Sequence, residues 1–342
     1  MAGPAYRLKR GIDRAVRGGR GVVLLYHRIA DDVSDPYGLC VSPSLFEEHL
    51  QFIRASGRPM PLPDVVRALR AGSLPDRAIC LTFDDGYLDN LEHAAPLLER
   101  YEVPATVFVT TGRAGRDREF WWDELERIFL QPGRLSDQLE LEIEGQVHAL
   151  SLGVDSAYTA EDQKRHRGWH LDDARTPTRR HAVFREVYHR VRPLPVSTRT
   201  AVMDRLLAWA GVRADDVRPS HAAMEPGQVV ELSRSGLVHI GAHTINHPDL
   251  SAHDHATQQH EIASSKRELE GWLGGGVSGF AYPYGMYNDV SVDLARSLGF
   301  HFACAGEHHL LRRRTDPFLL PRIDVPSGDG DALAKLLRHR LW

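Results

Sequence analysis

The sequence predicts an α/β protein built on a parallel sheet or barrel, with a long insertion between its two halves. Short apolar runs alternate with helical patterns over residues 21–112, and the alternation resumes over 221–342. Residues 113–220 do not show it. Such alternation favours a parallel sheet, whose functional residues lie just beyond the carboxyl ends of the strands.

The first half contains five expected elements. One helix begins where Ser44 and Glu47 have the spacing of a capping box, and one strand directly follows Pro104. The expected elements are strands at 22–26, 78–83 and 105–109 and helices at 44–55 and 90–100.

The second half continues with three helices and four strands. Candidate functional residues again follow strands: His243 comes directly after one strand and Tyr284 shortly after the next, as Asp85 follows the strand at 78–83. The expected elements are helices at 226–235, 257–273 and 290–298 and strands at 237–242, 279–282, 300–304 and 318–323.

The insertion at 113–220 is expected to be an α-rich subdomain with a small hairpin. It begins with an aromatic and acidic run at 120–124, continues with an alternating segment at 139–150, and contains an Arg- and His-rich stretch at 164–180. Period-two alternation is typical of strands. We expect residues 21–112 and 221–342 to form the barrel domain.

Composition excludes some classes of partner and compartment. The chain has 342 residues, and its net charge of −4 gives no argument for nucleic acid binding. Cys40, Cys80 and Cys304 lack CxxC spacing and are interpreted as reduced, buried residues. No apolar run approaches the ~18 residues of a membrane span, and the amino terminus lacks the apolar core of a signal peptide. We therefore expect a cytoplasmic location.

Residues 1–20 have the pattern of a short basic amphipathic helix or arm. Two interpretations stay open. One is a solvated leader packed on the domain, and the other is contact with a membrane surface or an anionic substrate. The second would place the protein peripherally at the inner membrane face. The basic residues are Arg7, Lys9, Arg10, Arg14 and Arg17.

The most informative residues are two adjacent carboxylates, Asp84 and Asp85, and two imidazoles four residues apart, His243 and His247. Neighbouring residues at a strand end point in different directions, so one carboxylate can bind a metal while the other stays free as a base. Two His and one carboxylate leave coordination positions open, as a hydrolytic zinc site requires.

Three motifs carry a family resemblance: Thr-Phe-Asp-Asp-Gly at 82–86, His-Thr-Ile-Asn-His-Pro at 243–248 and Phe-Ala-Tyr-Pro-Tyr-Gly at 280–285. Together they resemble the polysaccharide deacetylase family, also called the NodB-homology group or carbohydrate esterase family 4. The resemblance covers roughly residues 20–110 and 221–325. It implies a deformed (β/α) barrel that hydrolyses acetyl groups on sugars with a divalent metal, foremost Zn²⁺, with Co²⁺, Ni²⁺ or Mn²⁺ as alternatives.

The resemblance also implies a role for each matching residue. Asp85, His243 and His247 match the metal ligands, and Asp84 matches the general base. The third motif adds two expected substrate-binding residues, Pro283 and Tyr284.

An acid must protonate the leaving amine, and two histidines compete for that role. His339, in a Leu-x-His motif, fits the family's carboxyl-terminal pattern but lies in a basic terminal helix pattern. His27 lies at the end of the first strand and resembles the acid of the permuted poly-N-acetylglucosamine deacetylase subgroup. Because a strand end faces the metal side of a barrel, we favour His27. We expect an acceptor such as Asp324 to orient its ring and raise its pKa.

The third motif departs from the family at Ala281, where an Arg usually orients the base and keeps it ionised. Arg322, near the last expected strand, is the candidate that supplies this guanidinium; a structural ion pair is the alternative.

Other candidates have less support. Trp121 and Trp122 either stack on sugar rings or pack the core of the insertion, and both interpretations stay open. His308 and His309 lie in an expected loop, where substrate contact is one interpretation. Three further histidines are expected to be solvated, namely His253, His255 and His260.

The predicted function is a metal-dependent hydrolase that removes N-acetyl groups from an N-acetylhexosamine-containing saccharide or glycolipid. Close alternatives are an N-deformylase or an O-deacetylase on the same scaffold. Two other classes are a non-catalytic carbohydrate-binding relative and a non-haem iron oxygenase with a two-His-one-carboxylate site. The free carboxylate of Asp84 favours hydrolysis. The sequence predicts a carbohydrate partner and indicates no oligomeric state.

Overall fold

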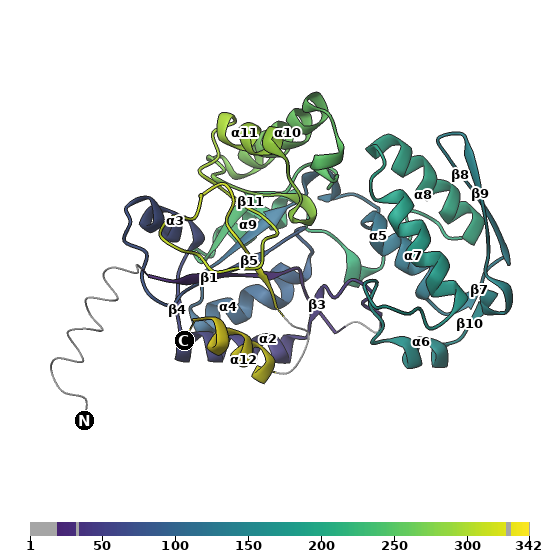
Figure 1. Ribbon diagram of the computed structural model, residues 1–342, viewed down its shortest axis with the longest axis horizontal. Helices are drawn as coiled ribbons and strands as arrows, with labels where there is room; N and C mark the ends of the chain where they lie inside the picture. Colours follow the sequence, from purple (N-terminus) through teal and green to yellow (C-terminus); the bar gives the residue numbers. More distant parts are fainter. Residues whose placement is uncertain (1–18, 32–33, 326–329, 342) are drawn as a thin grey trace.

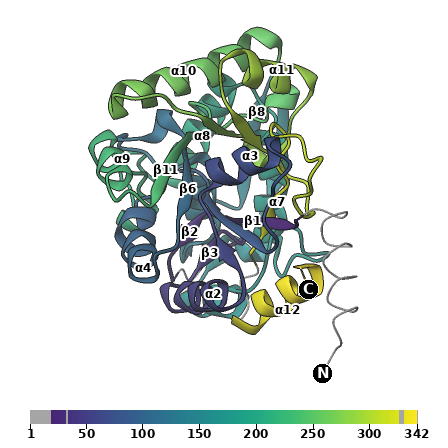
Figure 2. The ribbon, with the colours of Figure 1, turned by 90° about the vertical axis from the view of Figure 1, so that its left-hand side faces the viewer.

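The computed structural model describes residues 19–31, 34–325 and 330–341. Its centre is a curled sheet of eight strands whose pairs are all parallel, with helices packed around it (Figures 1 and 2). This confirms the expected fold class, a deformed (β/α) barrel with an inserted α-rich subdomain. The arm expected over 1–20 lies outside the described residues, except for Gly19 and Arg20.

The strands are β1 Gly21–Tyr26, β4 Arg58–Pro59, β5 Ala78–Phe83, β6 Ala105–Val109, β11 Val238–Ala242, β12 Gly279–Ala281, β13 Phe302–Cys304 and β14 Ile323–Asp324. Their order is β13-β12-β11-β6-β5-β1-β14, with β4 beside the start of β5. β1 and β5 pair in register from Gly21↔Ala78 to Tyr26↔Phe83. All of β5 is buried, as is typical of a parallel strand covered on both faces.

The chain at 317–325 connects the two ends of the sheet. Leu320 forms an isolated parallel bridge with β13, and β14 pairs with β1. The strand expected at 318–323 is therefore wrong in extent, and only Ile323–Asp324 is a strand. Arg322 still donates its N–H to the carbonyl of Glu307, which follows β13, at 3.0 Å, whereas Val325 donates to Leu25 of β1 at 3.2 Å, so the chain passes from β13 to β1 over these residues.

The helices of the barrel lie close to their expected positions, with two differences. The helix expected at 90–100 begins as a π-helical turn at Asn90–Ala94, where Pro96 cannot donate the regular backbone hydrogen bond. The helix α3 has no counterpart in the sequence-based expectations. The helices are α2 Pro43–Ser56, α3 Leu62–Arg70, α4 Ala95–Tyr101, α9 Pro226–Ser233, α10 His255–Leu273, α11 Asp289–Ser297 and α12 Gly330–Leu341.

The insertion lies beside the barrel and has its own hydrophobic core (Figure 1). Leu125, Phe129, Phe184 and Leu206 are among the fully buried residues of that core. The expected hairpin and helices are present, whereas the exact boundaries 113–220 stay a prediction. The elements are α5 Trp121–Leu130, β7 Gly133–Arg134, β8 Gln138–Ile143, β9 Gln146–Ser151, β10 Ala157–Tyr158, α6 Ala160–His166, α7 Arg179–Val191 and α8 Val196–Ala210.

Among the described residues, no disulfide joins the three cysteines; Cys80 and Cys304 are buried, and Cys40 is partly exposed rather than buried as expected. Within the described ranges, none of the helices has both the length and the apolar character needed to cross a bilayer.

Candidate metal and catalytic site

The two carboxylates lie in a tight turn after β5. Asp84 donates its backbone N–H to the carbonyl of Tyr26, and the carbonyl of Asp85 accepts from the N–H of Thr110 at 3.1 Å. Asp85 and Gly86 both have positive φ, 73° and 84°, so the chain reverses sharply here. The turn sends the two neighbouring side chains in different directions.

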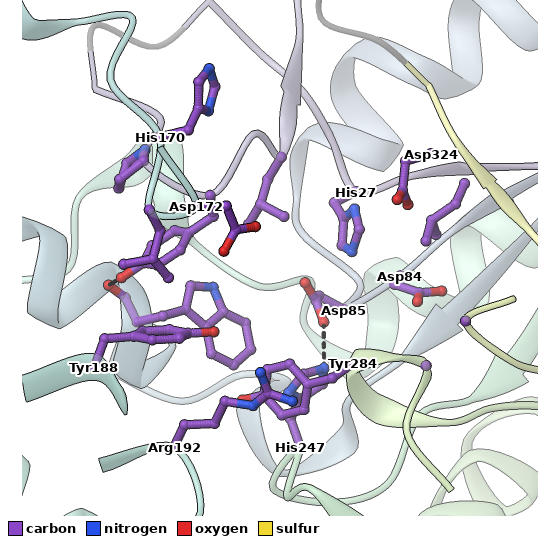
Figure 3. Close-up of a pocket in the computed structure, with 18 of the residues that line it drawn as sticks. His27, Asp84, Asp85, His170, Asp172, Tyr188, Arg192, His247, Tyr284 and Asp324 are labelled. Atoms are coloured by element: carbon purple, nitrogen blue, oxygen red, sulfur yellow. Dashed lines mark hydrogen bonds and ion pairs between the residues drawn. The ribbon is translucent and has the colours of Figure 1, made fainter. Parts of the chain in front are cut away.

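Asp85, His243 and His247 converge on one point. Asp85 Oδ1 lies 3.5 Å from His247 Nε2 and 3.7 Å from His243 Nε2, and Figure 3 shows Asp85 facing His247. All three side chains are buried, and their candidate ligand atoms lie within 4.8 Å of one another. This is the spacing of a set of ligands around a single cation.

The hydrogen bonds of these residues also fit a metal. His243 Nδ1 lies 2.8 Å from the carbonyl of Ala281, so Nδ1 carries the proton and Nε2 keeps its lone pair. Neither His243 Nε2 nor Asp85 Oδ1 has a hydrogen-bond partner among the described residues, although both are buried. One carboxylate and two imidazoles are a donor set that suits Zn²⁺ or a similar divalent ion.

The pKa shifts point the same way. Burial lowers the pKa of His243 to about 4 and that of His247 well below its ordinary value, so both imidazoles are neutral at pH 7. Burial, and then the charge of Asp84, raises the pKa of Asp85. A buried carboxylate of this kind is stabilised in its ionised form by an adjacent cation.

Asp84 has a different partner. The guanidinium of Arg322 donates to both of its oxygens, from Nη1 to Oδ1 at 2.7 Å and from Nη2 to Oδ2 at 2.8 Å. Burial, the largest single effect, raises the pKa of Asp84. The charge of Arg322, the charge of His243 and the hydrogen bonds from Arg322 together outweigh it, so the pKa falls below its ordinary value. Arg322 thus lies where the sequence predicts a replacement for the Arg that is missing at Ala281.

His27 lies directly after β1 and lines the same cavity as Asp84 (Figure 3). Burial lowers its pKa; the charge of Asp84 opposes this effect, that of Arg322 adds to it, and that of Asp324 opposes it. The expectation of a raised pKa is therefore wrong. The Asp324 carboxylate lies 3.6 Å from His308 Nδ1, and no hydrogen bond joins it to His27 among the described residues.

His339, the rival acid candidate, belongs to α12, and its side chain lies outside the described part of the chain. α12 packs against α2, with the Arg338 guanidinium 5.9 Å from the ring of Phe52. Neither residue of that contact lines the cavity.

The cavity has a volume of about 470 Å³, within the usual range for a small-molecule site. The barrel lines it with His27, Asp84, Asp85, His247, Tyr284 and Arg322. The insertion forms the facing wall with Trp122, His170, Leu171, Asp172, Tyr188, His189 and Arg192. A third side comes from the loop between β2, Arg28–Ile29, and β3, Cys40–Val41, through Pro36, Tyr37 and Leu39.

The expected substrate-binding residues divide into two groups. Trp122 and Tyr284 line the cavity, and their rings lie 4.8 Å and 4.5 Å from that of His247. Trp121 and Pro283 are buried away from the cavity wall. Trp121 stacks on Tyr188 at 5.2 Å instead, because the insertion core takes up its ring.

Sequence reasoning missed Tyr37, Tyr188 and Arg192 on the cavity wall. Tyr188 and Arg192 are four residues apart at the end of α7, so they lie on one helix face. That spacing was the available signal, but nothing in the sequence shows that this face points at the barrel.

The sequence of this chain is similar to those of known polysaccharide deacetylases over the segments that carry the site. A family model described as polysaccharide deacetylase matches residues 71–136 and 216–303. The poly-beta-1,6-N-acetyl-D-glucosamine N-deacetylase of Escherichia coli K12 is 31% identical over 86 residues, 25% of this chain and 13% of that protein. The Staphylococcus aureus MSSA476 protein of the same name is 31% identical over 78 residues, 22% of this chain and 27% of that protein. The match thus spans well under a third of both relatives.

Solved structures show the same fold over nearly the whole chain. The Streptococcus pyogenes deacetylase PplD, in complex with acetate, aligns with a TM-score of 0.57 and 20% identity over 93% of this chain and 98% of that one. IcaB from Ammonifex degensii aligns with a TM-score of 0.57 and 19% identity over 93% and 97%. Asp84, Asp85, His243 and His247 all lie inside the two segments that match the polysaccharide deacetylase model, and the chain is similar to that family over those segments.

Proposed function

We propose that this protein is a metal-dependent hydrolase that removes N-acetyl groups from an N-acetylhexosamine-containing saccharide. The observation that carries the proposal is the separation of two adjacent carboxylates into two environments. Arg322 binds Asp84 through both oxygens, whereas Asp85 faces two buried imidazoles. A general base must stay ionised and unligated, whereas a metal ligand must face the other ligands, so the two roles require these two environments. The names of the two relatives above support the choice of an N-acetylated glycan.

Asp85, His243 and His247 would hold the divalent cation, which would supply the Lewis acidity that polarises an acyl carbonyl and acidifies water. Asp84 takes up the proton of the attacking water. Because Arg322 lowers its pKa, Asp84 is ionised at neutral pH and ready to accept that proton.

His27 is proposed to donate a proton to the nitrogen of the leaving amine. It lines the cavity together with Asp84 and Asp85. Since burial lowers its pKa, His27 is neutral at rest and takes up a proton from solvent before it can act as the acid. Once protonated, it is a stronger acid than a solvated imidazole. That strength suits protonation of an amine, which leaves poorly as an anion.

Aromatic residues are proposed to hold the sugar. Trp122, Tyr188 and Tyr284 line the cavity. Aromatic rings offer apolar area with a polar atom at one end, which suits a ring that carries both C–H and O–H groups.

The test is acyl release from a panel of N-acetylated oligosaccharides, including a β-1,6-linked N-acetylglucosamine oligomer, with metal analysis of the same sample. We expect acetate and a free amine in equal amounts, and loss of both after chelation. Release of formate or of O-linked acetate would instead support the alternative hydrolases. No acyl release from any substrate by metal-loaded protein would contradict the proposal.

A further inference from the structure

The loop that carries His247 is held by two buried charges of opposite sign. Glu261 of α10 accepts from the backbone N–H groups of Ile245 at 3.0 Å and Asn246 at 2.9 Å. Arg199 of α8, in the insertion, donates to the carbonyl of Asn246 at 2.6 Å and to that of His247 at 3.4 Å. Both charged residues are only 3% exposed.

Other backbone groups of this loop are satisfied from within the barrel. The N–H of Gly112 donates to the carbonyl of Ile245 at 2.8 Å, and that of Thr111 donates to Thr244 at 3.1 Å. The N–H of His247 donates to Thr244 Oγ1 at 3.0 Å. Among the described residues, the insertion therefore supplies the hydrogen-bond donor for two backbone carbonyls of this loop, those of Asn246 and His247, and that donor is Arg199.

The loop conformation needs such support. Thr244 and His247 have φ of 64° and 52°, in the left-handed region, which is strained for residues other than glycine and persists only where the surroundings impose it. The buried carbonyl of His247 would in addition lose a hydrogen-bond donor if Arg199 were absent. Without Arg199 the loop would relax, and the His247 ring would move away from Asp85 and His243.

A second arginine of the insertion contacts the barrel close to the same loop. Arg192, which follows α7, lies 3.3 Å from the carboxylate of Asp249, two residues beyond His247. Its guanidinium also lies 4.2 Å from the centre of the Tyr284 ring, which in turn packs on His247. The insertion therefore contacts the ligand loop and its neighbour at two separate points.

We propose that Arg199 is a positioning residue for the metal, through which the insertion sets the metal affinity of the barrel. Arg199 contacts the backbone of the ligand loop and lies outside the ligand set. The inference rests on the proposed metal site and extends it, because it gives the insertion a function besides lining the cavity.

The experiment is a Co²⁺ titration of the full chain after chelation, in which the visible absorption of bound Co²⁺ reports affinity and coordination geometry. Arg199→Met should weaken Co²⁺ binding by about 10–100-fold, the usual effect of removing a group that orients a ligand, and should alter the spectrum. Arg199→Lys keeps one cationic donor and should recover part of the affinity.

Arg180→Met is the matched control. Arg180 is an equally buried arginine of the insertion, 1% exposed, and it donates to carbonyls within the insertion, such as those of Phe129 and Ser156. Its replacement should lower stability and leave the Kd for Co²⁺ unchanged.

An unchanged Kd and spectrum in folded Arg199→Met would overturn the inference while leaving the proposed function intact. If that variant does not fold, Arg199→Lys decides in the same way. Absence of Co²⁺ binding by the wild-type chain would instead overturn the proposed metal site itself.

Discussion

The barrel and the insertion line the same cavity with different kinds of residue. The barrel contributes the ionisable set, in which Asp84, Asp85 and His247 lie directly after strands or in the loops that follow them. The insertion contributes mainly aromatic and basic side chains, among them Trp122 and Tyr188 from helices, together with a turn at residues 170–172. Residues at strand ends are held in fixed positions, as catalytic groups require. The insertion instead forms a broad side wall of the cavity, where it can contact the substrate.

We expect the largest losses of activity from substitutions of the barrel residues that line the cavity. Asp84→Asn should lower acetate release by roughly 10²–10⁴-fold while metal binding is retained, because the variant loses the base and keeps the ligands. Asp85→Asn should lose the metal. Metal content and kcat measured on both variants check this. Loss of the metal in Asp84→Asn alone would mean that the two carboxylates exchange roles.

His27→Ala should reduce amide hydrolysis by roughly 10²-fold or more, because the amine then leaves without a proton. The same variant should retain more activity on an activated aryl acetate, since a phenolate leaves unprotonated. His339→Ala serves as the comparison and should be nearly neutral on both substrates. An essential His339 with a dispensable His27 would show that the family's usual order of motifs applies here.

The wall formed by the insertion should affect binding more than chemistry. Tyr188→Ala should raise KM by about 3–10-fold with little change in kcat, because the ring contributes equally to the ground state and the transition state. Tyr158→Ala, in the same insertion but away from the cavity, is the control and should leave KM unchanged. A fall in kcat at constant KM for Tyr188→Ala would show that this side chain contributes to the catalytic step rather than to substrate binding.

A smaller effect is the pH dependence of the free energy of unfolding, to which one buried histidine in each of the two cores contributes. Burial lowers the pKa of His181, in the insertion, to about 3 and that of His49, in the barrel, to about 4. The unfolded imidazole, with a pKa near 6.5, binds a proton that the folded one does not, so the free energy of unfolding falls as pH drops from about 6.5 towards 4. This loss is at most about 1.4 kcal/mol per pH unit and histidine.

Replacing either histidine by Phe should therefore flatten the dependence of unfolding free energy on pH between 6.5 and 4. Urea unfolding at several pH values measures this slope. An identical slope in the wild type and both variants would show that neither imidazole stays neutral in the folded state.

Much of the barrel could be predicted because its signals are local. The run at 78–83 followed by Asp84 and Asp85 indicates a strand and its carboxyl end, and parallel pairing brings such ends together. Arg322 could be proposed because the family position at Ala281 lacks a guanidinium. Its contact with Asp84 depends on the chain joining β1 after Pro321.

The contacts of the insertion could not be predicted in the same way. The contact between Arg199 and the ligand loop joins residues almost 50 positions apart, through a docking geometry that no local pattern contains. Trp121 and Trp122 are adjacent in sequence, yet one packs the core and the other lines the cavity. The lowered pKa of His27 follows from burial, which depends on the tertiary fold.

The proposed metal site is tested by measuring zinc content and acetate release in one preparation of wild type and of His247→Ala. We expect stoichiometric zinc and acetate release in the wild type. We expect neither in the variant, with the circular dichroism spectrum unchanged. Full zinc occupancy in His247→Ala, or acetate release by zinc-free wild type, would contradict the proposed metal site.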